Sequence, residues 1–175
     1  MKTFIMVFLL IGLTNLMMAQ NNIAVLTPTN ELVYASKISN TDAKVNSDYL
    51  STFTNYKFAA KIEAFQNAVA NYDIKTAAVY QSKSNDTYTV DFKDSKNKVT
   101  AIYDKEGQLI SCQENYKGIK LPYSIASKIT TEHPNWSIKA VDCEIQYSNE
   151  NQKSSVNYQV VIKSNKKTKT ITIAL

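Results

Sequence analysis

The sequence predicts an α+β fold in which helices pack on one face of an antiparallel sheet. Apolar residues recur at helical spacing between Lys57 and Ala70, which indicates an amphipathic helix. The segments that follow alternate apolar and polar residues between short turns, which is typical of half-buried strands. The pattern Asn-aromatic-x-Ile-Lys stands at Asn71–Lys75 and again at Asn135–Lys139. We therefore expect two tandem repeats, each a helix followed by antiparallel strands.

The first repeat is expected to span residues 54–118. Asp104–Gly107 is interpreted as a hairpin loop, because glycine readily adopts the positive φ that such loops require. Ser84–Asp86 is interpreted as another turn. The helix presents one apolar stripe, formed by Phe58, Ile62, Phe65 and Val69. Strands are expected at 74–81, 87–93, 98–103 and 108–113.

The second repeat is expected to span residues 119–175. Pro122 suits a helix start, because its missing N–H would lack a partner there, and Pro134 ends the helix. Tyr72 and Trp136 each follow a predicted helix, and we expect both to fill the junction between helix and sheet. Strands are expected at 138–147, 157–163 and 168–175.

The N-terminus has the pattern of an export signal. Lys2 is followed by the apolar run Phe4–Leu13, and Ala19 offers a cleavage site. The run is too short for a comfortable membrane span, so we expect a signal peptide at 1–19, a periplasmic or secreted product and no stable membrane insertion after cleavage. Residues 20–53 belong to neither repeat. They are expected to form an N-terminal arm, partly disordered or added as an edge strand.

Composition excludes several classes of function. The net charge is +5, and all 20 basic residues are lysines. Arginine is the usual bidentate ligand of phosphate and guanine, so no nucleic-acid partner is expected. The chain has only three glycines, which leaves no glycine-rich loop for a nucleotide, and no cofactor is expected. The basic run Lys163–Lys169 is interpreted as a solvated hairpin turn rather than an anion-binding patch.

No catalytic or metal-binding group is predicted. His133 is the single histidine and lies beside no nucleophile motif. One histidine and two distant cysteines do not provide the closely spaced ligands of a zinc site. Asp142 and Glu144 would share one face of a strand, and we interpret them as the solvated side of the sheet rather than an acid–base pair.

Cys112 and Cys143 are the two cysteines of the chain. An even number of cysteines outside the cytoplasm is typical of a disulfide, which here would close a loop of about 30 residues and stabilise the fold by about 3 kcal/mol. Two buried, unpaired thiols are the alternative, because cysteine also behaves as a small apolar residue. Both interpretations stay open, since a sequence does not give the Cβ geometry of a pair.

Tyrosine is unusually frequent, with 11 in the chain. It is a good strand former and is also enriched at protein-binding surfaces. Tyrosines within the predicted strands are expected to pack on the sheet. Tyr116 and Tyr123 lie near Gly118 and Pro122, outside the predicted strands, and we expect them to be exposed contacts for a partner.

Short motifs follow one another in a characteristic order along the chain. They are a lead-in at Thr54–Ala59, a strand into Tyr103–Gly107, a strand that reaches Leu121–Pro122, a helix end at His133–Pro134, and the aromatic-x-Ile pair Trp136 and Ile138. With these motifs, residues 55–175 resemble the PepSY-like proteins, which are related in fold to the β-lactamase-inhibitor protein. The resemblance implies an envelope-targeted protein with helices on an antiparallel sheet, and protein binding or inhibition as its role. The helix end Thr131–Trp136 departs from the aromatic-Pro-Gly turn that is frequent in this family.

These observations lead to a functional expectation with two rivals. We expect a secreted or periplasmic, non-catalytic module that binds, and in one form inhibits, another envelope or extracellular protein through the open sheet face and adjoining loops. The rivals are an extracytoplasmic hydrolase that uses carboxylates and a structural envelope component. A concave pocket with carboxylates of perturbed pKa would favour the hydrolase. Self-association through a free sheet edge would favour the structural component.

Overall fold

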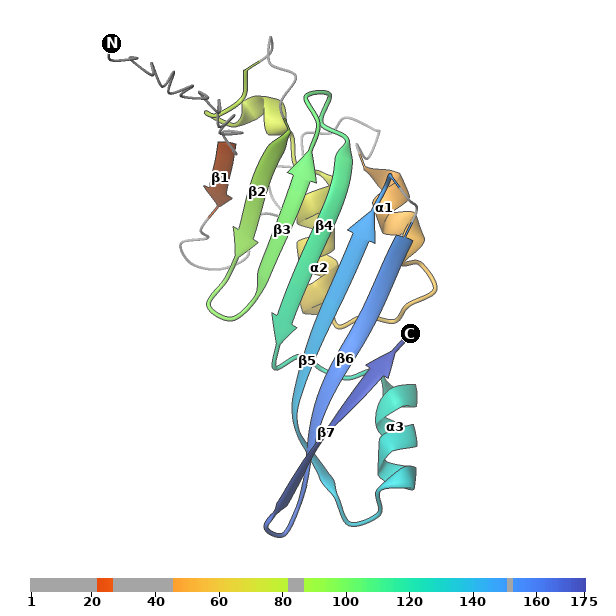
Figure 1. Ribbon diagram of the computed structural model, residues 1–175. Helices are drawn as coiled ribbons and strands as arrows, with labels where there is room; N and C mark the ends of the chain where they lie inside the picture. Colours follow the sequence, from red (N-terminus) through yellow and green to blue (C-terminus); the bar gives the residue numbers. More distant parts are fainter. Residues whose placement is uncertain (1–21, 27–45, 82–86, 151–152) are drawn as a thin grey trace, which may run out of the picture.

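A computed structural model describes residues 22–26, 46–81, 87–150 and 153–175. One seven-stranded sheet, in the order β1-β2-β3-β4-β5-β6-β7, forms a layer against which the helices pack (Figure 1). Strands β2 to β7 pair antiparallel with their neighbours, and β1 pairs in parallel with β2. The elements are β1 (Asn22–Leu26), α1 (Ser47–Thr52), α2 (Ala60–Ala70), the 3-10 helix η2 (Ile74–Thr76), β2 (Tyr88–Lys93), β3 (Lys98–Tyr103), β4 (Leu109–Lys117), α3 (Tyr123–Glu132), β5 (Ser137–Ser148), β6 (Lys153–Ser164) and β7 (Lys167–Ala174).

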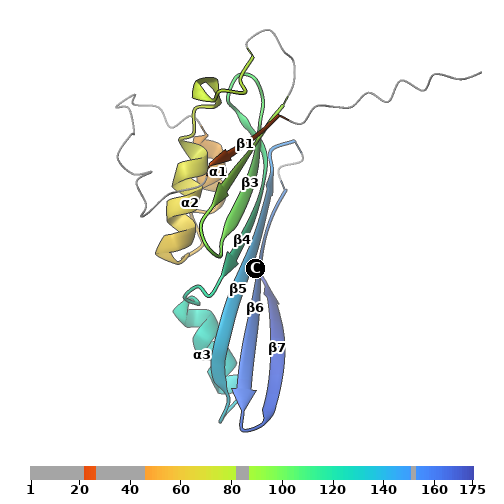
Figure 2. The ribbon, with the colours of Figure 1, turned by 90° about the vertical axis from the view of Figure 1, so that its left-hand side faces the viewer.

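The three α-helices of the described residues lie on the same face of the sheet (Figure 2). Helix α2 lies behind β3 and β4, α1 lies at the adjoining end of β5 and β6, and α3 lies against the opposite end of the sheet, beside β5 to β7. No described helix covers the other face, which we call the open face. Antiparallel sheets commonly pack one face on a core and leave the other solvated. The predicted α+β class, with helices on one face of an antiparallel sheet, is confirmed.

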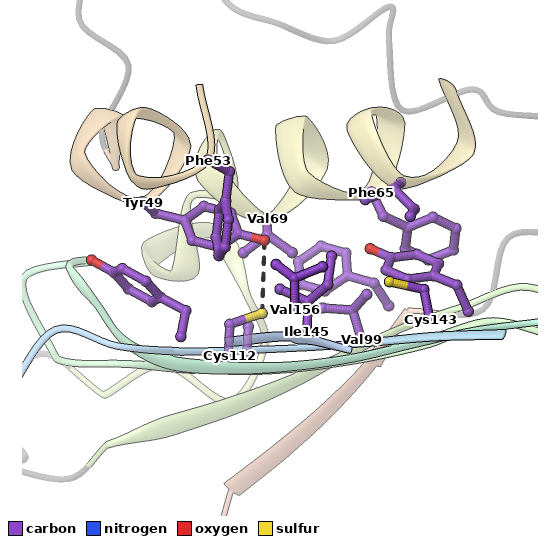
Figure 3. Packing of buried hydrophobic residues seen from close by; sticks show 14 of the residues in the cluster. Tyr49, Phe53, Phe65, Val69, Val99, Cys112, Cys143, Ile145 and Val156 are labelled. Atoms are coloured by element: carbon purple, nitrogen blue, oxygen red, sulfur yellow. Dashed lines mark hydrogen bonds between the residues drawn. The ribbon is translucent and has the colours of Figure 1, made fainter. Parts of the chain in front are cut away.

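The core lies between the helices and the covered face of the sheet (Figure 3). The alternation of side chains along each strand places it there. In β3, Val99, Ala101 and Tyr103 are buried, whereas Thr100 and Ile102 between them point to the open face and are half-buried. The same period in β6 buries the four residues Val156, Tyr158, Val160 and Ile162.

The predicted turns and helix start have the expected geometry. Gly107 in the β3–β4 hairpin has φ 93°, in the region that favours glycine. Pro122 is the residue that caps the start of α3. Asn165, with φ 49°, lies in the tight β6–β7 hairpin within the basic run Lys163–Lys169, which is therefore a hairpin turn as predicted. Strand β4 extends to Lys117 rather than ending at residue 113.

The strand predicted at 74–81 is wrong. Ile74–Thr76 forms the 3-10 helix η2, and Lys75 N donates a hydrogen bond to Asp73 Oδ1 at 3.0 Å. An aspartate that accepts from a backbone N–H two residues on favours a turn over a strand. The second copy of the Asn-aromatic-x-Ile-Lys pattern differs, because Ile138 lies in β5. The turn predicted at Ser84–Asp86 lies outside the described residues.

Residues 46–53, which the sequence analysis assigns to the N-terminal arm, belong to the core. Tyr49 and Phe53 of the α1 segment are buried against Tyr147 of β5, with ring centroids 5.1 and 6.4 Å from it. Residues 22–26 form the edge strand β1. The remainder of the predicted arm lies outside the described residues.

Asn46 joins three parts of the chain. Its side-chain Nδ2 donates to Gly107 O at 3.1 Å, and its Oδ1 accepts from Leu109 N at 2.7 Å, which ties it to the β3–β4 hairpin. Its backbone N–H donates to Ala70 O at the end of α2. Asn46 is only 6% exposed, so these bonds are shielded from water. The start of α1 is thereby fixed to both the hairpin and α2.

Replacement Asn46→Ala is expected to destabilise the fold by about 3 kcal/mol, because it leaves the buried Leu109 N–H without a partner and removes a second hydrogen bond. Urea unfolding followed by tryptophan fluorescence measures the change. Asn115→Ala, at an exposed position on the open side of β4, is the matched control and should alter the free energy of unfolding by less than about 0.5 kcal/mol. Equal effects of the two replacements would contradict this role of Asn46.

Candidate functional site

The open face carries a shallow hollow of about 580 Å³ over β3, β4, β5 and β6. Cross-strand pairing arranges its side chains in two rows. One row runs through Ile102, Ser111, Ser148 and Lys153, and the other through Thr100, Gln113, Gln146 and Ser155. We call these eight residues the polar hollow. Seven of the eight are uncharged, and six of those offer a hydroxyl or an amide for hydrogen bonding.

Charged side chains border the polar hollow. The next row on the open face contains Lys93, Lys98 and Glu144. At the β2 edge, Asp91 accepts from Lys93 at 2.8 Å and from Lys98 at 3.3 Å, and the Thr100 hydroxyl donates to it at 2.7 Å. Burial acts to raise the pKa of Asp91, but these hydrogen bonds outweigh it and lower the pKa. The charges at this border therefore largely neutralise one another.

Behind the polar hollow, a carboxyl group is enclosed in the core. Glu114 of β4 is 0% exposed and points to the helices. The Tyr49 hydroxyl donates to its Oε1 and the Tyr116 hydroxyl to its Oε2, each at 2.6 Å. Gln66 Nε2 of α2 lies 3.4 Å from both carboxyl oxygens. We call Glu114, Tyr49, Tyr116 and Gln66 the Glu114 cluster. It connects α1 and α2 to the central strand β4.

Burial raises the pKa of Glu114 to about 7. Hydrogen bonds from Tyr116, Tyr49 and Gln66 act in the opposite direction and limit this rise in pKa. Burial also raises the pKa of both tyrosines well above the ordinary value, and the neighbouring carboxyl adds to this. The tyrosines therefore remain hydroxyl donors at every ordinary pH. Within the Glu114 cluster, only the Glu114 carboxyl changes charge near pH 7.

The Glu114 cluster does not have the form of an acid–base site. Both carboxyl oxygens are engaged by neighbours, and the group is sealed from solvent. A general acid or base must come within hydrogen-bond reach of the proton that it transfers. The arrangement instead ties the helical layer to the sheet, and it lies directly behind Gln113 and Asn115, the neighbours of Glu114 in β4.

The two tyrosines predicted to contact a partner have opposite positions. Tyr123, at the first residue of α3, is 86% exposed. Tyr116 is only 1% exposed, so its predicted exposure is wrong. The reason is the length of β4, which continues to Lys117 and places Tyr116 on the covered face beside Phe65, with ring centroids 5.7 Å apart.

Cys112 and Cys143 are free and buried, so the disulfide alternative is wrong in this structure. Cys112 pairs with Tyr147 across β4 and β5, and Cys143 pairs with Tyr116. Four residues of an antiparallel ladder separate the two cysteines, roughly 13 Å along the strands, whereas a disulfide needs Cα atoms within about 7 Å. Figure 3 shows them apart in the core, with the Cys112 thiol donating to the Tyr49 hydroxyl at 4.0 Å.

The other residues singled out in the sequence lie apart from one another. His133 follows the last residue of α3 and lies edge-on to Trp136, with ring centroids 6.3 Å apart. Asp142 accepts from Gly118 N at 3.2 Å, and Glu144 accepts from Gln146 at 3.0 Å. Both carboxylates are on the open face as predicted, each with its own partner. Trp136 is half-buried against the core.

Glu114 is the central residue that the sequence analysis missed. Cys112, Glu114 and Tyr116 alternate along β4, which places them on one face. A carboxyl group within an otherwise apolar face is the signal of a buried, hydrogen-bonded acid. The signal was lost because the strand was predicted to end at residue 113.

Neither a membrane-spanning helix nor a metal-binding cluster is present among the described residues. No described helix is long and apolar enough to span a membrane, and no cluster of three or more His, Cys, Asp or Glu side chains there could hold a metal ion. Comparison of the chain with family models, curated proteins and solved structures gives no match. The signal peptide predicted at 1–19 lies outside the described residues.

Glu114 predicts a pH dependence of stability. Its pKa is about 7 in the folded protein against an ordinary value of 4.5, so the folded state holds the proton more tightly. Stability should therefore fall as pH rises from about 4.5 to about 7, by roughly 3 kcal/mol, and then level off. Urea unfolding at intervals from pH 4 to pH 9 measures this.

Glu114→Gln keeps the size of the side chain and removes its titration, so the fall between pH 4.5 and 7 should be largely absent in this variant. Glu144→Gln on the open face is the matched control and should retain it. An unchanged profile in Glu114→Gln would show that other groups cause the pH dependence.

The cysteines should behave as two buried thiols. Burial raises the pKa of Cys112 well above the ordinary value and that of Cys143 to about 12, so both resist reaction as thiolates. The intact mass should not change on reduction. A thiol-specific reagent should label both cysteines quickly in denaturant and much more slowly in the folded protein. A gain of two mass units on reduction would contradict this prediction.

Proposed function

We propose that the chain is a non-catalytic protein-binding module that acts in the periplasm or outside the cell, where binding also provides a route to inhibition. The observation that carries the proposal is the polar hollow. Its seven uncharged side chains lie together on the open face near the β5–β6 turn, and the row with Lys93, Lys98 and Glu144 borders them on one side. The centres of protein interfaces are depleted of charged residues, whereas their rims are polar and charged.

The partner that suits this surface is an extended or flat protein segment with its own hydrogen-bonding groups. Hydroxyl and amide side chains such as Ser111, Gln113 and Gln146 both donate and accept, so they match peptide groups or polar side chains. The short serine and threonine side chains lose little entropy on binding, which favours a contact through them. The Glu114 cluster behind β4 ties this strand to α1 and α2.

We also propose that the fold is built from two tandem repeats of the PepSY-like type, at 54–118 and 119–175. Two observations support this: α2 is followed by the meander β2-β3-β4, and α3 by the meander β5-β6-β7. The copies of the Asn-aromatic-x-Ile-Lys pattern lie at corresponding places, after α2 and after α3. An export signal at 1–19 would bring this module to an envelope or extracellular partner.

Capture by chemical crosslinking tests the binding surface. Tagged protein is crosslinked in envelope extract, and captured proteins are identified and quantified by mass spectrometry. One saturable partner is expected. The double replacement Gln113→Lys and Gln146→Lys puts two charges into the polar hollow and should reduce capture at least tenfold, because buried unpaired charge at an interface centre is strongly unfavourable.

Two controls locate the surface. Thr172→Lys adds a lysine to the same face on β7, away from the polar hollow, and should leave capture unchanged. Tyr123→Ala tests the exposed tyrosine on the helical face. Loss of capture in Tyr123→Ala but not in the double lysine variant would move the binding surface to α3. Absence of any saturable partner would contradict the proposal.

A further inference from the structure

The helical face carries a second hollow, of about 260 Å³, between α1, the connection 53–59 and α2. Three aromatic rings of the connection line it. The Phe53 ring lies 5.9 Å from both the Tyr56 ring and the Phe58 ring, and the Tyr56 and Phe58 rings are stacked at 5.5 Å with an interplanar angle of 6°. Phe53 is buried, and Tyr56 and Phe58 are half-buried. We call this hollow the aromatic cage.

The polar groups of the cage are mainly hydrogen-bond acceptors. Gln66, 4% exposed, directs its amide N–H groups to Glu114, and among the described residues its Oε1 accepts no hydrogen bond. Asn67 Nδ2 donates to the Glu63 carbonyl at 2.8 Å, which leaves the Asn67 Oδ1 available. The Glu63 carboxylate is exposed and forms no ion pair within the described part of the chain. The Tyr56 hydroxyl is the one donor left among these groups.

Glu63 is the one charged residue among those that line the cage, and the exposed Lys57 of the connection is not among them. Lys61 of α2 is already bound to Asp94 at 3.2 Å. Burial acts to raise the pKa of Asp94, but hydrogen bonds from Lys96 N, Asn97 and Lys61 lower it to about 2, so this ion pair persists at ordinary pH. The Glu63 carboxylate therefore lacks a cation from the lysine nearest to it in α2, although the chain as a whole carries a net charge of +5.

We propose that the aromatic cage binds the ammonium or guanidinium group of a lysine or arginine side chain on a protein partner. Aromatic faces attract cations, and the free acceptors of Glu63, Gln66 and Asn67 match the donors of such groups. The hollow is smaller than the roughly 300–1,000 Å³ of small-molecule sites, so a single side chain fits it better than a larger ligand. The cage lies on the face opposite the polar hollow and is a contact separate from the one proposed above.

Nuclear magnetic resonance titration of the purified protein tests the proposal without the natural partner. The probes are N-acetyl-arginine amide, N-acetyl-lysine amide and N-acetyl-citrulline amide. Citrulline has nearly the shape of arginine but no charge. Resonances of Phe53, Tyr56 and Phe58 should shift with the two cationic probes, and the citrulline probe should bind about five- to thirty-fold more weakly. Equal binding of arginine and citrulline probes, or no shift up to tens of millimolar, would overturn the proposal.

Variants assign the interaction to named groups. Glu63→Gln, on the helix surface, and Phe58→Leu, which keeps apolar bulk but removes the aromatic face, should each weaken arginine binding about three- to ten-fold. Glu132→Gln on α3 removes another exposed carboxylate, which lies 3.9 Å from Lys128 and far from the cage, and should have no effect. Unchanged affinity in Glu63→Gln, whose fold is not at risk, would exclude recognition of charge by the cage.

A last comparison identifies the source of the cation. If the cage receives a protein side chain, the blocked peptide acetyl-Gly-Arg-Gly-amide should bind at least as tightly as the unblocked amino acid arginine. Tighter binding of free arginine would assign the cage to a small-molecule amine and overturn the partner assignment. Because these probes need no captured protein, the result is independent of the crosslinking experiment on the polar hollow.

Discussion

The fold depends on a carboxyl group that the core encloses. Glu114 would cost several kcal/mol if it were buried without partners. The Tyr116 hydroxyl bonds to it from the same strand, and the Tyr49 hydroxyl reaches it only when α1 meets β4 in one arrangement. Apolar contacts alone would allow a helix to shift along the sheet, because they have little directional preference. The Glu114 cluster therefore specifies how α1 and α2 sit on the sheet, and Asn46 fixes the same layer from the hairpin side.

The sequence predicted those parts of the fold in which local pattern and tertiary environment agree. Helix α2, strand β3 and the hairpin at Gly107 carry strong local signals, and each lies close to the predicted residues. The failures have specific causes. The segment after Asp73 is rich in apolar residues, but side-chain capping by Asp73 turns the chain. Helix α1 escaped notice because two aromatic residues in a polar segment, Tyr49 and Phe53, provide its core contacts.

The candidate surfaces were harder to predict, because both depend on contacts between distant residues. The polar hollow arises only when β3, β4, β5 and β6 align small polar side chains across four strands. Alternation within a strand indicates which of its residues face solvent, but the local sequence does not give the register that gathers residues of four strands. The aromatic cage likewise requires the 53–59 connection to fold back onto α2. Tyr116 and Tyr123, chosen because they are close in sequence, lie on different structural elements with opposite exposure.

The pairing of β1 has a consequence for the way the chain folds. Strands β2 to β7 follow their sequence order across the sheet, so each new strand can add to one that precedes it closely in the chain. Strand β1 also lies next to β2, but the two strands are far apart in the chain, since Asn22 pairs with Tyr88. Contacts between segments that are distant in the chain have a larger entropic cost of loop closure and form more slowly. The sheet can therefore assemble as a local meander from β2 onward. Strand β1 is synthesised first, but it can pair only after β2 has been synthesised much later.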